Sequence, residues 1–273
     1  HLKNQKATDL TVPPDGDPDI LPDENYAREI MQLFSIGLIQ LWQDGSFRLD
    51  PSTGLIQPTY DNTDITELSK IMTGWSFSRY SNNQGQFAAP LVNSSFTRGD
   101  GNKYYGHTYN HPMRLFGDFH DPGVKTIVGG QFIDNTSEAD LDLRAAADDS
   151  DALDWLAGKE GDPTYTGHPS TPPFIARRLI QRLVTSNPSN GYVYRVSQAF
   201  IDSNGDLGAT ARAILLDYEA RSMSLINGVG YGKMKEPIVR YMQLLRGLQA
   251  STQLPVSELG AFGLDSQQLN NFL

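Results

Sequence analysis

Cysteine is absent from this 273-residue sequence. Its absence excludes disulfide bonds, thiolate nucleophiles and sulfur ligands for metals, but it leaves the cellular compartment open. Basic residues are scarce as well, since 22 Lys and Arg against 32 Asp and Glu give a net charge of −10 at pH 7. This charge opposes binding to nucleic acid phosphates and to anionic membrane surfaces. We therefore expect no nucleic acid partner, and instead an unknown protein or a small molecule that is cationic or neutral.

Long apolar runs are also missing from the sequence. No stretch approaches the ~20 apolar residues that a membrane helix needs, so we expect no membrane span. Apolar residues still make up 38% of the chain, which at this length supports a substantial core. The 25 Gly and 16 Pro indicate long polar loops between the elements of that core.

The clearest helix signal begins at Asp23 and runs to about Gly37. Asp23 can accept hydrogen bonds from the free amides of the first turn, and Gly37 lies where a left-handed residue commonly ends a helix. Apolar residues recur at helical spacing and predict the buried face: Tyr26, Ile30, Leu33 and Phe34. Caps and apolar stripes predict further helices with inward apolar faces: from Asp61 or Asp64 to Gly74, then 171–184, 189–201, and from Pro237 onward. Asp206 caps another helix, which runs to about Tyr218, and a further helix covers about 138–156.

Strand signals are short by comparison. Alternating apolar residues on both sides of Asp121-Pro122-Gly123 predict a hairpin within 113–133, and residues 42–60 form a loop or an irregular hairpin. The expected fold is therefore mainly α: a single helical domain with long loops and one or two short β-hairpins. We divide the chain into a polar acidic linker (1–22), a helical core (23–250) and a C-terminal extension (251–273).

Motifs distributed along this core resemble a known family. They are ENYAREIMQLFSIGL (24–38), LSKIMTGW (68–75), HDPGVKTIVGG (120–130), HPSTPPFIARRLIQRLVTSNPS (168–189) and YGKMKEP (231–237). In this order they resemble the bacterial family called domain of unknown function 1800, which has no established reaction. The resemblance implies a fragment that lacks the family's N-terminal part and C-terminal tail, so the missing parts of its own chain are another expected partner. It also implies export to the periplasm or cell surface, although no signal peptide is recognised in this sequence.

Two histidines inside these motifs, His120 and His168, are candidates for chemistry. Histidine titrates near neutrality and ligates metals. We hypothesise that a cleft gathers the candidate catalytic residues Glu29, His120, Asp121 and His168. His120, Asp121 and His168 would hold a divalent metal (Zn or Ca) that lowers the pKa of a bound water toward ~7, and a free carboxylate would act as base.

Positive side chains near these motifs are candidates for ligand binding. Arg28 and Lys125 would supply positive charge to the cleft, and Arg177, which neighbours Arg178 and Arg182, could clamp a phosphate or carboxylate. In the alternative interpretation the arginines of 177–182 are a solvated face. His120 and His168 would then bond loop carbonyls, Asp121 would cap its turn, and Arg28 would tie the helix to the hairpin.

An acidic stretch near the start gives a separate metal hypothesis. Asp15, Asp17, Asp19 and Asp23 alternate as in the first half of an EF-hand loop. The sixth position lacks glycine, however, and the twelfth is Tyr26 where a bidentate glutamate is needed. A calcium-stabilised surface protein therefore competes here with a solvated linker.

These observations leave two main functional hypotheses. The first is an exported, metal-assisted hydrolase with a site made of histidines and carboxylates. The second is a non-catalytic binding or assembly protein of the cell envelope, whose motif residues join helices. The two hypotheses differ in where Glu29, His120 and His168 lie in the folded chain.

Overall fold

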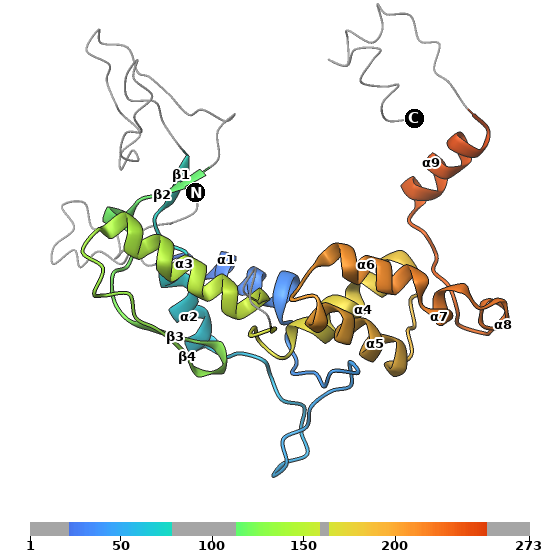
Figure 1. The fold of residues 1–273 in the computed structure, drawn as a ribbon, viewed down its shortest axis with the longest axis horizontal. Helices are drawn as coiled ribbons and strands as arrows, with labels where there is room; N and C mark the ends of the chain where they lie inside the picture. The colour runs from blue at the N-terminus through green and yellow to red at the C-terminus, as the bar shows by residue number, and fades with distance from the viewer. Residues whose placement is uncertain (1–21, 78–112, 159–163, 250–273) are drawn as a thin grey trace, which may run out of the picture.

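The computed structural model describes residues 22–77, 113–158 and 164–249 (Figure 1). Over these ranges the chain folds into helices and two short pairs of antiparallel strands, which confirms the predicted mainly α class. The elements are α1 (Glu24–Glu29), η1 (Ile30–Ser35), α2 (Asn62–Ile71), β1 (Trp75–Phe77), β2 (Met113–Leu115), η2 (Gly117–Phe119), β3 (Lys125–Ile127), η3 (Val128–Gly130), β4 (Gln131–Ile133), α3 (Leu141–Ala157), α4 (Thr171–Leu183), α5 (Asn190–Asp202), α6 (Leu207–Leu216), α7 (Tyr218–Arg221), α8 (Met223–Ile226) and α9 (Pro237–Gly247). Within the described ranges, none of these helices combines the length and apolar content that crossing a bilayer requires.

The predicted linker and C-terminal extension lie outside the described residues, apart from Pro22. The two predicted boundaries between the three segments therefore stay predictions.

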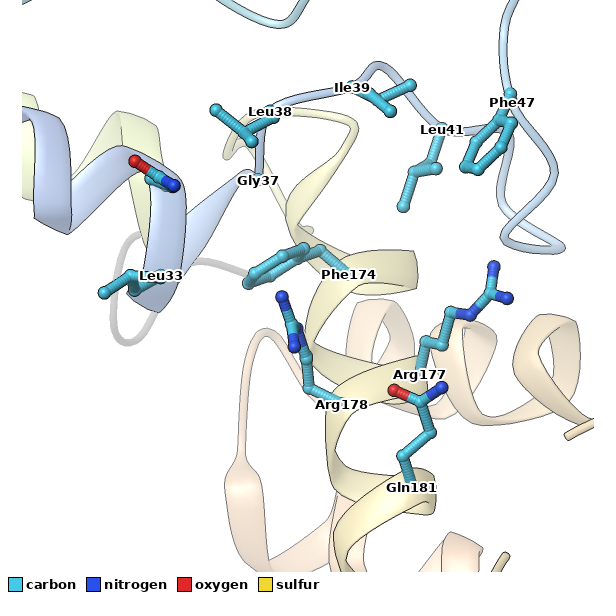
Figure 2. A pocket seen from close by; sticks show the side chains of 11 residues that line it. Leu33, Gly37, Leu38, Ile39, Leu41, Phe47, Phe174, Arg177, Arg178 and Gln181 are labelled. Atoms are coloured by element: carbon cyan, nitrogen blue, oxygen red, sulfur yellow. The ribbon is translucent and has the colours of Figure 1, made fainter. Parts of the chain in front are cut away.

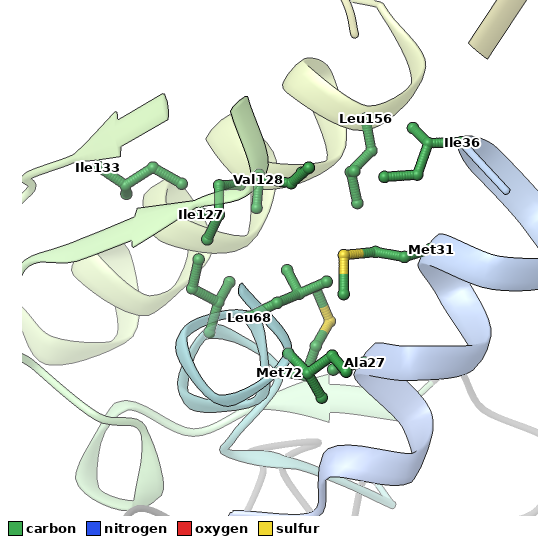
Figure 3. Packing of buried hydrophobic residues seen from close by; sticks show 12 residues of the cluster. Ala27, Met31, Ile36, Leu68, Met72, Ile127, Val128, Ile133 and Leu156 are labelled. Carbon is green, nitrogen blue, oxygen red and sulfur yellow. The ribbon is translucent and has the colours of Figure 1, made fainter. Parts of the chain in front are cut away.

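The first cluster of buried residues lies where α1, η1 and α2 meet α3 and the β3–β4 pair. Figure 3 shows Met31 pointing toward Leu68 of α2 and Met72, which directly follows that helix; Leu156 of α3 belongs to the same cluster. Asp61 and Asp64 form a capping box at the start of α2, which confirms the predicted cap. The cluster thus joins segments that are far apart in the sequence.

The first helix begins at the predicted cap but buries a different face. The carboxylate of Asp23 accepts the cap hydrogen bond, and Ala27 and Met31 are fully buried. Residues predicted to be buried are instead exposed: Tyr26, Leu33 and Phe34. The helix continues as the π-helix η1, whose turns hold more residues than an α-turn, so a spacing of 3.6 no longer selects one face.

The strands pair differently from the predicted hairpin. β2 pairs with β1, which places Leu115 opposite Trp75, and β3 pairs with β4, which places Lys125 opposite Ile133. The prediction that 113–115 fold back onto 126–128 is therefore wrong. The tight turn is instead Val128-Gly129-Gly130, where both glycines have positive φ.

A second cluster of buried residues lies among α4, α5 and α6. Its members are Ala176, Ile180, Tyr192, Val193, Val196 and Ile214. The hydroxyl of Tyr192 donates to the carbonyl of Ile214 at 2.6 Å, so its polar end is satisfied inside the cluster. Ser189 caps α5 and Asp206 caps α6, as predicted.

The segment 38–58 and the end of α3 connect the two clusters. Gln43 donates to the Gln198 side chain of α5 at 2.8 Å, and Arg177 of α4 donates to the carbonyl of Gly45 at 3.1 Å. The ring of His168 meets Trp155 of α3 edge-on, with 5.7 Å between their centroids.

The last described helix, α9, lies apart from this body (Figure 1). It begins at Pro237 as predicted, but none of its residues is buried. Ile238, Tyr241 and Leu248, which were predicted to face inward, are all exposed.

Candidate functional site

His120 lies at the centre of a buried polar network. Its side chain follows the turn η2 and is only 1% exposed. Nδ1 lies 3.1 Å from the carbonyl oxygen of Thr73, and Nε2 lies 3.0 Å from Oδ2 of Asp148. Since a carbonyl oxygen can only accept, Nδ1 carries the hydrogen. Both ring nitrogens therefore have partners within the protein.

Lys125 and Asp148 complete this network. The Lys125 ammonium, which is fully buried, donates to Asp148 and to the carbonyl of Asp121, and Asn135 donates to the other oxygen of Asp148 at 2.9 Å. Burial on its own raises the pKa of Asp148. Hydrogen bonds from His120, Lys125 and Asn135 outweigh burial and lower that pKa to about 2. The network thus joins the end of α2 to η2, β3 and α3.

Asp121 and Glu29 contribute no free acid or base to this network. Oδ1 of Asp121 accepts the amide of Gly123 at 2.9 Å and so caps the turn, which is the role of the alternative interpretation. The Asp121 amide donates to the Thr73 hydroxyl at 2.9 Å. Glu29 is exposed on α1 and, among the described residues, makes no hydrogen bond or ion pair with the network.

His168 lies in a different environment, at the start of α4. Its Nδ1 accepts the amide of Ser170 at 3.2 Å, and its own amide donates to the carbonyl of Trp155 at 2.6 Å. Burial, assisted by the positive charge of Arg48, lowers the pKa of His168 to about 4. The imidazole is therefore neutral at pH 7 and positions the loop between α3 and α4.

The predicted metal ligands do not fit a metal. His120 uses both ring nitrogens in hydrogen bonds within the protein. Oδ1 of Asp121 and Nδ1 of His168 are bonded to the amides of their own loops. In the part of the chain that the structure describes, no group of three or more His, Asp or Glu is placed to hold an ion. Of the predicted calcium residues, Asp15, Asp17 and Asp19 lie outside the described residues, and Asp23 caps α1.

The buried aspartates of α3 are the residues that sequence reasoning missed. The buried stripe of this helix consists of Ala145, Asp148, Asp149, Ala152 and Leu156. A buried carboxylate needs a buried partner, so two aspartates in the apolar stripe of a helix indicate a buried polar network. The helical spacing of 145–156 could therefore have identified Asp148 and Asp149. Asp149 accepts from the Trp75 indole at 3.4 Å, and burial raises its pKa.

A pocket of about 290 Å³ lies between η1, the segment 38–47 and α4 (Figure 2). Arg177 and Arg178 reach into it from α4, and Phe174 lies between them and Leu33 of η1. Its lining residues are Gln32, Leu33, Gly37, Leu38, Ile39, Leu41, Phe47, Phe174, Arg177, Arg178 and Gln181. The pocket therefore combines apolar side chains with two cations.

The predicted binding residues thus lie in three places. Arg177 lines the pocket, whereas Lys125 is enclosed in the His120 network. Arg28 is half-buried on α1, where its positive charge partly offsets the rise in the pKa of Tyr60 that burial causes.

Comparison with known proteins identifies the family of this chain. A family model described as protein of unknown function (DUF1800) matches residues 1–272. Neither a curated protein nor a solved structure matches the chain significantly. Because the family model covers nearly the whole sequence, the chain belongs to the DUF1800 family.

Proposed function

We propose that this protein is a non-catalytic binding or assembly protein of the cell envelope, whose motif residues hold helices together. The observation that carries the proposal is the buried network of His120, Lys125 and Asp148. All three side chains are at most 2% exposed, and each is bonded within the protein. The envelope location rests on the family resemblance alone.

The competing metal-assisted hydrolase places demands that these side chains do not meet. A general base needs a nitrogen that can reach a proton of the substrate, and a metal ligand needs a free lone pair. His120 directs one nitrogen to Thr73 and the other to Asp148. The buried network therefore supports a structural role for this motif.

Exposed apolar side chains support binding to a partner. These side chains follow one another along one stretch of the chain, which we call the 33–56 apolar face: Leu33, Phe34, Leu38, Trp42, Phe47, Leu49, Leu55 and Ile56. Each of them is at least 46% exposed. A concentration of large exposed apolar side chains commonly marks an interaction site.

Metal content separates the two functions. We expect elemental analysis of the purified chain to find no stoichiometric zinc or calcium, and the thermal midpoint to be unchanged by chelators. One equivalent of metal per chain would overturn the proposal if its removal lowers the midpoint and if a His168→Asn variant loses it. This variant is suitable because an asparagine oxygen can still accept the Ser170 amide.

Site-specific photocrosslinking tests the 33–56 apolar face in the source organism. A photoreactive residue at Leu55, which is 69% exposed, should give one discrete protein adduct. The matched control is Leu143 on α3, which is 59% exposed and lies outside this face. Similar adducts from both positions, or none from Leu55, would contradict a binding role for the face.

A further inference from the structure

We infer that the pocket between η1 and α4 binds a small amphipathic anion, an apolar chain or ring that carries one carboxylate or phosphate group. This inference rests on the proposed binding function and assigns it a ligand class. The pocket volume of about 290 Å³ is close to the lower limit of small-molecule sites. Its occupant is therefore a small molecule and not a folded partner.

Two guanidinium groups provide the charge. Arg177 uses one nitrogen to hold the carbonyl of Gly45 at 3.1 Å, which fixes its orientation and leaves its other N–H groups for a ligand. The guanidinium carbon of Arg178 lies 5.2 Å from the centroid of the Phe174 ring. Neither arginine forms an ion pair within the described residues, and no Asp or Glu lines the pocket. An anion would supply the missing negative charge.

Arg182, one turn further along α4, shows the opposite arrangement. Its guanidinium forms an ion pair with Glu236, and both side chains are more than half exposed. The same helix therefore carries one arginine that is already neutralised and two that are not. This difference makes Arg182 an internal control for any effect of removing positive charge from α4.

The apolar part of the pocket is built around Phe174. Gly37, at φ 74°, lies so close to this ring that an added Cβ would be 2.6 Å from it. The close approach lets η1 and α4 share one apolar wall, which Leu33 and Phe47 extend toward solvent. Both of these side chains are about half exposed. Apolar surface beside unpaired cations favours a ligand with an apolar body and an anionic head.

Carboxylate and phosphate share the relevant chemistry, because both accept parallel hydrogen bonds from a guanidinium. Isothermal titration of the full chain with octanoate and with octyl phosphate distinguishes these two heads, since the tighter ligand identifies the preferred group. We expect both anions to bind. Octan-1-ol and octylammonium should bind at least about tenfold more weakly, and acetate, which lacks the apolar body, should give no measurable binding.

Variants of α4 and η1 locate the binding. Arg177→Gln and Arg178→Gln should each weaken octanoate binding about fivefold or more, and Leu33→Gln should do so through the apolar wall. Arg182→Gln is the matched control and should leave the affinity within about twofold. Thermal unfolding of each variant verifies that the fold is retained, since all four side chains are at least partly exposed.

Three results would overturn the inference. They are no binding of either anion, equal binding of octylammonium, and an equal loss of affinity in Arg182→Gln and Arg178→Gln. None of these results would touch the proposed function, because metal content and crosslinking at Leu55 test that function independently of the pocket.

Discussion

The buried ammonium of Lys125 shows that the motif residues act by positioning elements of the fold. The ammonium of Lys125 has Asp148 as its anionic partner, and both are withdrawn from water. A buried ion pair adds little net stability compared with apolar residues of similar size, but breaking it leaves an unpaired charge. The network therefore specifies how α2, β3 and α3 fit together more than it adds stability.

Asp148→Ala should lower the free energy of unfolding by about 3–5 kcal/mol, because Lys125 would stay buried without its anion. The double variant Lys125→Met, Asp148→Leu should be less destabilised, since it removes both charges and fills the space. Urea unfolding measures all three proteins. A double variant that loses as much stability as Asp148→Ala would contradict an ion-pair network.

The acid sensitivity of the fold should show two separate pH windows. The pKa of His168 falls from 6.5 to about 4 on folding, so the unfolded chain binds this proton more readily. Its stabilising contribution of about 3 kcal/mol is present above pH 6.5 and is lost as the pH falls to about 4. The pKa of Asp148 falls from 3.8 to about 2, so its contribution of about 2 kcal/mol is lost as the pH falls from 3.8 to about 2.

The free energy of unfolding, measured against pH in wild type and in His168→Asn, tests this assignment. Between pH 6.5 and 4 the free energy of unfolding of the variant should change less than that of wild type. Below pH 4 both proteins should lose stability as Asp148 is protonated. Parallel curves over the upper window would show that another group causes the acid sensitivity.

At the scale of elements, the docking of η2 on α3 depends on one glycine. A Cβ on Gly117 would lie 2.1 Å from the carbonyl carbon of Leu141, and the Gly117 amide donates to Asp142 at 2.7 Å. Backbone atoms of a helix cannot move aside as the end of a side chain can. His120 follows directly after η2, so this contact also positions the network.

Gly117→Ala should therefore cost at least about 2 kcal/mol, through overpacking against backbone. Gly247→Ala on α9 is the matched control, because nothing lies within 4 Å of its added Cβ, and its stability should be unchanged or slightly higher. Thermal unfolding compares the two variants. A Gly117→Ala protein as stable as wild type would mean that η2 does not pack tightly on α3.

Element boundaries followed local chemistry, and this part of the fold was predictable. Asp61, Ser189 and Asp206 cap their helices because a side-chain oxygen two or three residues upstream of free amides can bond them in any fold. The pairing of β2 with β1 was not predictable, since Leu115 pairs with Trp75, a partner 40 residues earlier in the chain. Short strands carry too little pattern to identify their partner.

The candidate site was predictable in its residues and not in their surroundings. The motif identified His120 and Lys125, yet their partner Asp148 comes from a helix whose buried stripe had not been assigned. For the same reason the two histidines could not be placed in separate environments from sequence. The pocket was anticipated only through Arg177, because its apolar wall is formed by residues predicted to face the core.

At the scale of the whole molecule, the described residues form two buried clusters, and the helix α9 lies beyond them. The clusters share the segment 38–58 and the contact of His168 with Trp155, whereas α9 adds no buried side chain. The apolar residues of α9 have the spacing of a buried stripe but lie on an exposed face. Amphipathic spacing thus indicates a helix without showing what covers it.

Ile238→Ser combined with Leu244→Ser should leave the thermal midpoint nearly unchanged, because both residues are about 60% exposed and such surface changes stay within about 0.5 kcal/mol. Ile180→Ser in the second cluster is the control and should lower the midpoint strongly, since that side chain is fully buried. A strong effect of the α9 variant would show that α9 packs on the body in solution.

The enclosure of Lys125 has a consequence for covalent labelling. Acylating reagents modify lysine amines that meet the solvent, and the residues Lys70, Lys233 and Lys235 are partly or fully exposed, so we expect them to react before Lys125. The amine of Lys125 becomes available only when the body of the protein opens. The acylation rate of Lys125, followed by mass spectrometry, therefore reports how often the protein opens, and no label has to be introduced into the chain.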